Sequence, residues 1–275
     1  MPRLMVKGSE LAFAERGCGP AAVLLHSSAS TRSQWRSLHE ALKRCRRVLA
    51  PDLWGYGESP NYPGQVPCLA EETAVVEALV EYAGGPVDLV GHSYGGALAL
   101  RFTLDHQDLV RSLTLIEPVA FHLLRLGSAG ERWLLSEVEA VAAAVRRDRG
   151  GAGMRRFVDY WNHSGTWAGL SEDKRLGLAR LAARVANDFA ATLAEAIPLE
   201  TYRQIQVPVL LFRGGRSPAP TRRIVGLLGS TLPNVRVRTI AEAGHMLPLT
   251  HSEFVNGEIL AHMAAAASTR RSEAA

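Results

Sequence analysis

The sequence has little cysteine, no long apolar run and no strong excess of one charge. Three cysteines occur in 275 residues, Cys18, Cys45 and Cys68, and they form no Cys-x-x-Cys pair or other metal-ligand spacing. This usage argues against a disulfide framework and a zinc site, and favours a reduced intracellular chain. Met1–Glu15 alternates charged and apolar residues, unlike a signal peptide, and no run is long enough to span a membrane. We therefore expect a cytoplasmic protein without a membrane partner.

The charge balance excludes a further class of partner. Lys and Arg number 31 against 27 Asp and Glu, and part of the excess lies in two basic clusters, within Arg44–Arg47 and Arg146–Arg149. Neither cluster is interleaved with aromatic residues, so both are interpreted as solvated helix ends and not as a nucleic-acid site. The sequence also lacks a dinucleotide fingerprint and a P-loop. We expect no nucleic acid, cofactor or metal, and a monomer or homodimer.

The sequence does contain a regular alternation of short β-rich runs with longer helical patterns. Two opening strands followed by repeated strand–helix units predict a mostly parallel sheet that is covered on both faces. The predicted strands are Arg3–Lys7, Leu11–Glu15, Ala22–His26, Arg47–Ala50, Val87–Val90, Ser112–Ile116, Val207–Phe212 and Val235–Ile240. The helices predicted beside them are Glu71–Tyr82, Gly95–Asp105, Thr221–Leu228 and Glu253–Ala266.

This alternation stops between Val119 and Tyr202, where no strand pattern occurs. The segment instead predicts several helices, including Gly130–Arg146, Met154–Trp161 and Glu172–Glu195. We expect them to cap the carboxyl edge of the sheet, where α/β folds bind their ligands. The predicted organisation is an α/β core of residues 1–118 and 203–265, a helical cap of residues 119–202 and a disordered tail of residues 266–275.

The most informative motif follows the fifth predicted strand. Val87–Val90 leads into Gly-His-Ser-Tyr-Gly, with Ser93 at its centre, and a helical pattern begins at once. A nucleophile in this motif sits on a sharp turn, and the outer glycines let strand and helix pack closely. Backbone N–H groups at the helix N-terminus favour a developing negative charge there. We interpret Ser93 as a nucleophile; the alternative is a tight turn with a capping serine.

A serine nucleophile requires a base, and His245 is the candidate among the nine histidines. It lies in the loop between the last predicted strand and the final helix, and loops at strand ends commonly carry chemistry. A second loop, His26–Ser30, is rich in small residues and follows the third predicted strand. The backbone N–H groups of Ser28 and Tyr94 are predicted to form an oxyanion hole.

Together these motifs resemble the α/β-hydrolase superfamily over about residues 10–265. The resemblance includes Pro51–Ser59, which looks like the family's D-x-x-G-x-G-x-S loop, and in that loop Asp52 has a structural role. Ser27 departs from the glycine that the family usually has after His26. The resemblance implies an eight-stranded, mostly parallel sheet flanked by helices, with an inserted helical cap. Haloalkane dehalogenases and epoxide hydrolases of this fold use Asp as nucleophile, so Ser93 implies acyl chemistry instead.

The family's usual catalytic acid is missing from its expected place. It follows the seventh strand in a Gly-x-x-Asp pattern, but here Phe212–Pro220 contains no acid and has Ser217 at that position. The resemblance points to Glu117 at the end of the sixth strand, where some members carry the acid. The alternative for Glu117 is a structural carboxylate at the cap hinge. Asp159 and Asp188, in the predicted cap, would reach the histidine only by closure.

The predicted cap also holds many of the aromatic residues. Phe157, Tyr160 and Trp161 have the spacing of one helix face, and we expect them to contact a small, apolar acyl substrate. The predicted function is hydrolysis of a carboxylic ester through an acyl-enzyme, with Ser93, His245 and Glu117 as the triad. A thioesterase, lactonase, C–C bond hydrolase or perhydrolase on the same triad remains open. So does a non-catalytic small-molecule receptor of this fold.

Overall fold

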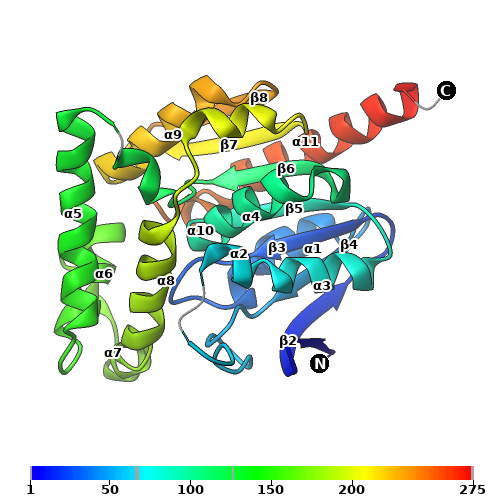
Figure 1. The fold of residues 1–275 in the computed structure, drawn as a ribbon. Helices are drawn as coiled ribbons and strands as arrows, with labels where there is room; N and C mark the ends of the chain where they lie inside the picture. Colours follow the sequence, from blue (N-terminus) through cyan, green and yellow to red (C-terminus); the bar gives the residue numbers. More distant parts are fainter. Residues whose placement is uncertain (1, 66–67, 126, 274–275) are drawn as a thin grey trace.

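One eight-stranded sheet organises the part of the chain that the structure describes (Figure 1). The structure is a computed structural model that describes residues 2–65, 68–125 and 127–273. The strands, in the order β1-β2-β4-β3-β5-β6-β7-β8, are antiparallel at β1–β2–β4 and parallel from β4 to β8. This confirms the predicted mostly parallel sheet. The strand bounds are β1 Arg3–Val6, β2 Ser9–Arg16, β3 Ala21–Leu25, β4 Arg47–Pro51, β5 Val87–His92, β6 Val110–Ile116, β7 Val209–Gly214 and β8 Val235–Ile240.

Helices cover both faces of the sheet, which is why its central strands are buried. All residues of β3 and β5 are buried, and alternate side chains such as Leu24 and Leu25 enter two separate hydrophobic clusters. The cluster around Leu24 is closed by α1 (Arg36–Leu42), α10 (Leu247–Thr250) and α11 (Ser252–Glu273). The cluster around Leu25 is closed by α2 (Leu69–Glu72), α3 (Ala74–Ala83), α4 (Tyr94–Asp105) and α9 (Ala219–Thr231).

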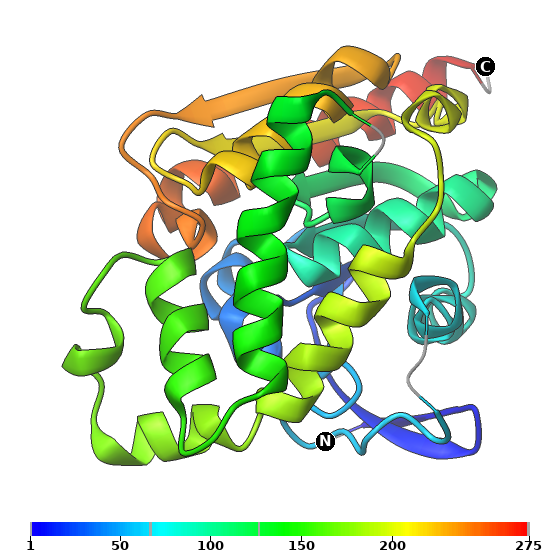
Figure 2. The same ribbon diagram turned by 60° about the vertical axis from the view of Figure 1, so that its left-hand side comes forward.

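Between β6 and β7 the chain forms a helical insertion, which we define as residues 121–204. Its helices stand together at one end of the sheet (Figures 1 and 2). They are α5 (Ala129–Arg146), α6 (Ala152–Trp161), α7 (Glu172–Ala179) and α8 (Ala182–Ala194), with 3-10 turns at Phe121–Leu124, Trp167–Gly169 and Leu199–Gln204. Among the described residues, no helix combines the length and the apolarity that crossing a membrane requires.

Two details of the helix prediction are wrong. The single helix expected at Glu172–Glu195 is divided at Arg180–Leu181, because α8 has a buried face that packs against α5 and α4, whereas α7 buries no residue. The tail predicted to be disordered from residue 266 continues α11 as far as Glu273 and projects beyond the sheet (Figure 1). Alanine has a high helix propensity, which favours the continued helix at residues 264–267. Residues 274–275 lie outside the described part.

Candidate active site

The turn that carries Ser93 is tight because of its flanking glycines. Ser93 directly follows β5 and precedes α4, with a φ of 56° and a ψ of −115°. A Cβ at Gly91 would lie 2.2 Å from the carbonyl oxygen of Gly95, and one at Gly95 would lie 2.3 Å from that of Leu25. Only glycine fits at either position, and the serine is held at the carboxyl end of the sheet.

His245 and Glu117 form a buried pair at the same end of the sheet. His245 Nδ1 lies 2.7 Å from Glu117 Oε2, and both side chains are almost fully buried. The other carboxylate oxygen accepts a hydrogen bond of 2.6 Å from the backbone N–H of Gly214, the last residue of β7. A carboxylate only accepts hydrogen bonds, so His245 donates from Nδ1 and its lone pair is on Nε2. His92 also donates from Nε2 to the backbone oxygen of His245, at 2.9 Å.

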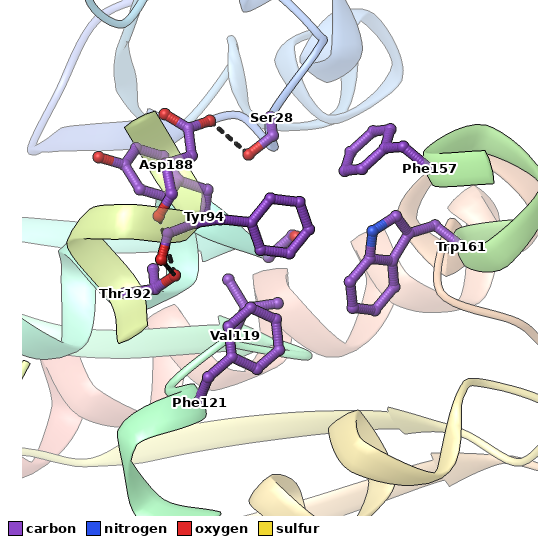
Figure 3. A pocket seen from close by; sticks show the side chains of 10 residues that line it. Ser28, Tyr94, Val119, Phe121, Phe157, Trp161, Asp188 and Thr192 are labelled. Atoms are coloured by element: carbon purple, nitrogen blue, oxygen red, sulfur yellow. Dashed lines mark hydrogen bonds between the residues drawn. The ribbon is translucent and has the colours of Figure 1, made fainter. Parts of the chain in front are cut away.

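A pocket with about 260 Å³ of atom-free space, part of it open to solvent, lies beside Ser93 (Figure 3). One wall is aromatic: the ring of Phe121 stacks on those of Trp161 and Phe189, with centroids 6.2 and 6.0 Å apart. Trp161 also covers the His245 imidazole, at 4.5 Å between ring centroids. The pocket is lined by Ser28, Ser93, Tyr94, Val119, Phe121, Phe157, Trp161, Asp188, Phe189 and Thr192.

The structure brings two of the three expected aromatic contacts into this pocket. Phe157 and Trp161 line it, whereas Tyr160 lies beside a separate surface hollow with Arg155 and Asp159. The expectation for Tyr160 is therefore not met. Residues four apart on a helix differ in direction by about 40°, whereas neighbouring residues differ by about 100°. Phe157 and Trp161 therefore lie on one narrow face of α6 that lines the cavity, and the Tyr160 side chain points away from it.

The proposed oxyanion donors have free N–H groups within the described part of the chain. Neither the backbone N–H of Ser28 nor that of Tyr94 has a hydrogen-bond acceptor there, and both residues line the pocket with Ser93. Ser27, which replaces the family's glycine, hydrogen bonds to Gln34 Oε1 through its backbone N–H and its hydroxyl, at 3.2 and 2.8 Å. The next residue but one, Ala29, has a φ of 56°, so this loop is strained.

A buried polar network, which no sequence motif predicted, lies beside the pocket at Ser28 and Asp188. Asp188 Oδ2 accepts hydrogen bonds from the hydroxyls of Ser28, at 2.5 Å, and Tyr56, at 2.6 Å. An Arg184 nitrogen lies 2.8 Å from Asp188 Oδ1 and 2.9 Å from both oxygens of Glu72. The available signal is the i,i+4 spacing of Arg184 and Asp188 on the same helix face as the apolar residues Val185 and Phe189.

Burial shifts the acid strengths in this network. It raises the pKa of Glu72 to about 7 and also raises the pKa of Asp188 above its ordinary value. Two carboxyl groups share one guanidinium, so the Arg184 charge does not fully compensate both of them.

Two other polar groups near the site have structural partners. His26 donates from Nδ1 to the backbone oxygen of Ser27 at 2.8 Å and accepts from the N–H of Leu53 at 3.0 Å. Burial lowers the pKa of His26 to about 4, so this ring stays neutral. Asp52 accepts from the backbone N–H of Arg32 at 2.8 Å and pairs with its guanidinium. Within the residues described, no group of three or more His, Cys, Asp or Glu side chains is arranged to hold a metal ion.

Comparison with known proteins adds relatives of several activities. The model of the alpha/beta hydrolase family matches residues 22–258. A 2-hydroxymuconate semialdehyde hydrolase from Pseudomonas putida is 25% identical over 269 residues, which are 91% of this chain and 89% of that protein. A soluble epoxide hydrolase from Corynebacterium sp. is 30% identical over 115 residues, 42% of this chain and 40% of that protein.

The first curated relatives are matched over less than half of their own length. Among solved structures, an esterase from Exiguobacterium antarcticum has a TM-score of 0.77 at 17% identity, covering 95% of this chain and 98% of that one. At this identity the similarity concerns the fold alone.

Proposed function

The chain belongs to the α/β-hydrolase family, and from that premise we propose that it is a serine hydrolase that cleaves a carboxylic ester through an acyl-enzyme at Ser93. The observation that carries the proposal is the buried hydrogen bond between His245 Nδ1 and Glu117 Oε2, 2.7 Å long, beside the nucleophile turn. A histidine held in this way has its basic Nε2 available for a serine proton. A merely structural histidine has no need of a buried carboxylate partner.

The proposed reaction has two halves. Ser93 Oγ attacks the ester carbonyl carbon while its proton passes to His245 Nε2, and Glu117 stabilises the imidazolium. The oxyanion accepts hydrogen bonds from the N–H groups of Ser28 and Tyr94. Collapse of the intermediate releases the alcohol, which takes the proton from His245. Water then adds to the acyl-enzyme, its proton passes to His245 and on to Ser93, and the carboxylic acid leaves.

The lining of the pocket supports a neutral, compact acyl group as the substrate class. Its described residues include several aromatic rings and one acid, Asp188, but neither Lys nor Arg. The atom-free space of about 260 Å³, part of it open to solvent, leaves little room for a long acyl chain. We expect p-nitrophenyl butyrate to be turned over faster than the octanoate and much faster than the anionic hemisuccinate. Preference for the hemisuccinate would contradict this substrate class.

One alternative has a specific observation in its favour. The relative named 2-hydroxymuconate semialdehyde hydrolase matches over nearly the whole chain, which supports C–C bond hydrolysis on the same triad. A muconate-derived substrate carries a carboxylate, however, and neither Lys nor Arg is among the described residues that line the pocket to receive it. Assaying a muconate semialdehyde beside the ester panel separates the two proposals.

The experiment that tests the proposed function is covalent labelling with a fluorophosphonate probe. The wild-type protein is expected to gain one probe per chain, on the peptide that contains Ser93, and Ser93→Ala is expected to gain none. Ser136→Ala, which removes an exposed hydroxyl on α5, is the matched control and is expected to label fully. Folded wild-type protein that does not label would favour a non-catalytic receptor.

A further inference from the structure

The loop that carries Ser28 is held by a residue of the helical insertion. Ser28 Oγ donates a hydrogen bond of 2.5 Å to Oδ2 of Asp188, a residue of α8 that is 160 positions further along the chain. Figure 3 shows this hydrogen bond as a dashed line between the Ser28 hydroxyl and the Asp188 carboxylate, at the edge of the pocket. Asp188 is only 3% exposed, so water does not compete freely for its oxygens.

The backbone of this loop needs external support. Ala29 has a φ of 56°, a conformation that residues other than glycine adopt at a cost. On one side, Ser27 is bonded to Gln34 within the same loop. On the other side, the hydroxyl of Ser28 has its bond to Asp188. The direction of the Ser28 N–H therefore depends on where α8 places that carboxylate.

Asp188 is itself fixed to the body of the protein. Tyr56, from the loop after β4, donates to the same carboxylate oxygen, and Arg184 links the other oxygen to Glu72 of α2. Arg184 and Glu72 are 7% and 0% exposed. The position of α8 relative to α2 and to the loop after β4 is thus set by a buried ionic network beside Ser28.

We propose that Asp188 is a positioning residue for the oxyanion hole: by accepting the Ser28 hydroxyl, it aims the Ser28 backbone N–H at the carbonyl oxygen of the substrate. The inference rests on the proposed function, since it assigns Ser28 as an oxyanion donor. Asp188 acts through Ser28 and takes no part in proton transfer. Its loss affects the transition state, where the oxyanion exists, more than substrate binding.

The test is a double-mutant cycle on ester turnover. Ser28→Ala removes the hydroxyl but keeps the N–H, Asp188→Leu removes the acceptor, and Asp188→Asn keeps one acceptor oxygen. Because outright loss of an oxyanion donor costs about 10²–10³ in kcat, we expect Ser28→Ala and Asp188→Leu to lower kcat by roughly tenfold or more, with KM little changed. Asp188→Asn should retain most of the rate. The double variant should be no slower than the slower single variant.

A transition-state analogue separates positioning from general stability. A trifluoromethyl ketone forms a tetrahedral oxyanion on a serine, whereas the matching secondary alcohol does not. The ratio of the two affinities is expected to fall in Ser28→Ala in step with kcat. It should be unchanged in Ser33→Ala, which removes an exposed hydroxyl further along the same loop.

Failure of the inference and failure of the proposed function give different experimental results. If Asp188→Leu does not fold, Ser28→Ala still tests the inference by itself. An unchanged kcat and affinity ratio in Ser28→Ala, or losses that add in the double variant, would overturn the role of Asp188 and leave the serine hydrolase intact. A wild-type protein that neither hydrolyses the ester nor binds the ketone would instead overturn the proposed function.

Discussion

At the scale of single residues, backbone strain gathers at the candidate site. In the described part of the chain, four residues other than glycine have a positive φ, and three of them are Ala29, Ser93 and Glu117. Such conformations cost about 1–3 kcal/mol each and persist only where the surroundings impose them. Ser93 lines the pocket, Glu117 pairs with His245, and Ala29 directly follows the pocket residue Ser28.

The role of Glu117 makes the sharpest prediction at this scale. Glu117→Gln keeps the size of the side chain but replaces a carboxylate that accepts from His245 Nδ1 and stabilises the imidazolium. Loss of the equivalent group in a serine protease triad costs about 10⁴ in kcat, and we expect a loss of that order on a p-nitrophenyl ester. Asp159→Asn is the control, since Asp159 accepts from the backbone N–H of Trp167, away from His245.

A rescue variant tests whether an acid after β7 can replace Glu117, which follows β6, as the partner of His245. Ser217 occupies the family's usual acid position, is 4% exposed and has a hydroxyl without a partner among the described residues. We expect Ser217→Asp to restore part of the activity lost in Glu117→Gln, measured with the same ester. A Glu117→Gln enzyme with a nearly full rate would show that Glu117 is a structural carboxylate.

At the scale of elements, α6 and α8 both line the pocket, and their rings meet where Phe157 contacts Phe189. Phe157 and Trp161 of α6 supply apolar surface, whereas α8 adds the polar groups of Asp188 and Thr192 beside the ring of Phe189. Both helices are amphipathic, but of the two only α8 brings polar side chains to the pocket.

The aromatic wall predicts a change in acyl preference. Trp161→Leu removes ring volume beside His245, so the pocket should accept longer acyl chains, and the ratio of octanoate to butyrate kcat/KM should rise. Tyr160→Leu, on the same helix but outside the pocket lining, is the matched control and should leave the ratio as it is. A shift in the control and none in Trp161→Leu would place the acyl site elsewhere.

The contact between α2 and α8 predicts a pH-dependent stability. Burial raises the pKa of Glu72 from its ordinary 4.5 to about 7, so between these values the folded protein keeps a proton that the unfolded chain has lost. This contribution is therefore fully present below about pH 4.5 and is lost as the pH rises through 7, with a slope of up to about 1.4 kcal/mol per pH unit.

Urea unfolding between pH 5 and pH 8 measures this slope. The Glu72→Gln variant has no titratable group at position 72, and Asp188 is then the carboxylate that pairs with Arg184. Its free energy of unfolding should therefore depend less on pH than that of the wild type. Parallel pH profiles for the two proteins would rule out Glu72 as the titrating group.

At the scale of the whole molecule, the sheet was predictable and the arrangement of the insertion was not. All eight strands follow local patterns, because β-rich runs such as Ala21–Leu25, buried at every residue, are rich in apolar side chains. Neither glycine nor proline stands at the break, Arg180–Leu181, and the break arises because α8 packs against α5 and α4 whereas α7 buries no residue. The placing of Asp188 against Ser28 likewise depends on tertiary packing.

The candidate site was likewise predictable from the sequence only in part. Ser93 and His245 are marked by their motifs and loops, whereas Glu117 was inferred from the empty acid loop and the strand order of the family. The structure brings Glu117 and His245, 128 positions apart, within hydrogen-bond distance. Their roles in the reaction remain this account's proposal, as does the role of Ser93.

The most direct test of the central claim is to capture the acyl-enzyme. Wild-type protein mixed with p-nitrophenyl butyrate is quenched in acid during turnover, digested and analysed by mass spectrometry. We expect one butyryl group per chain on the peptide that contains Ser93, formed together with a burst of p-nitrophenolate and accumulating further in a variant with slowed deacylation. Turnover in which Ser93 never carries the acyl group, or which persists in Ser93→Ala, would contradict the account.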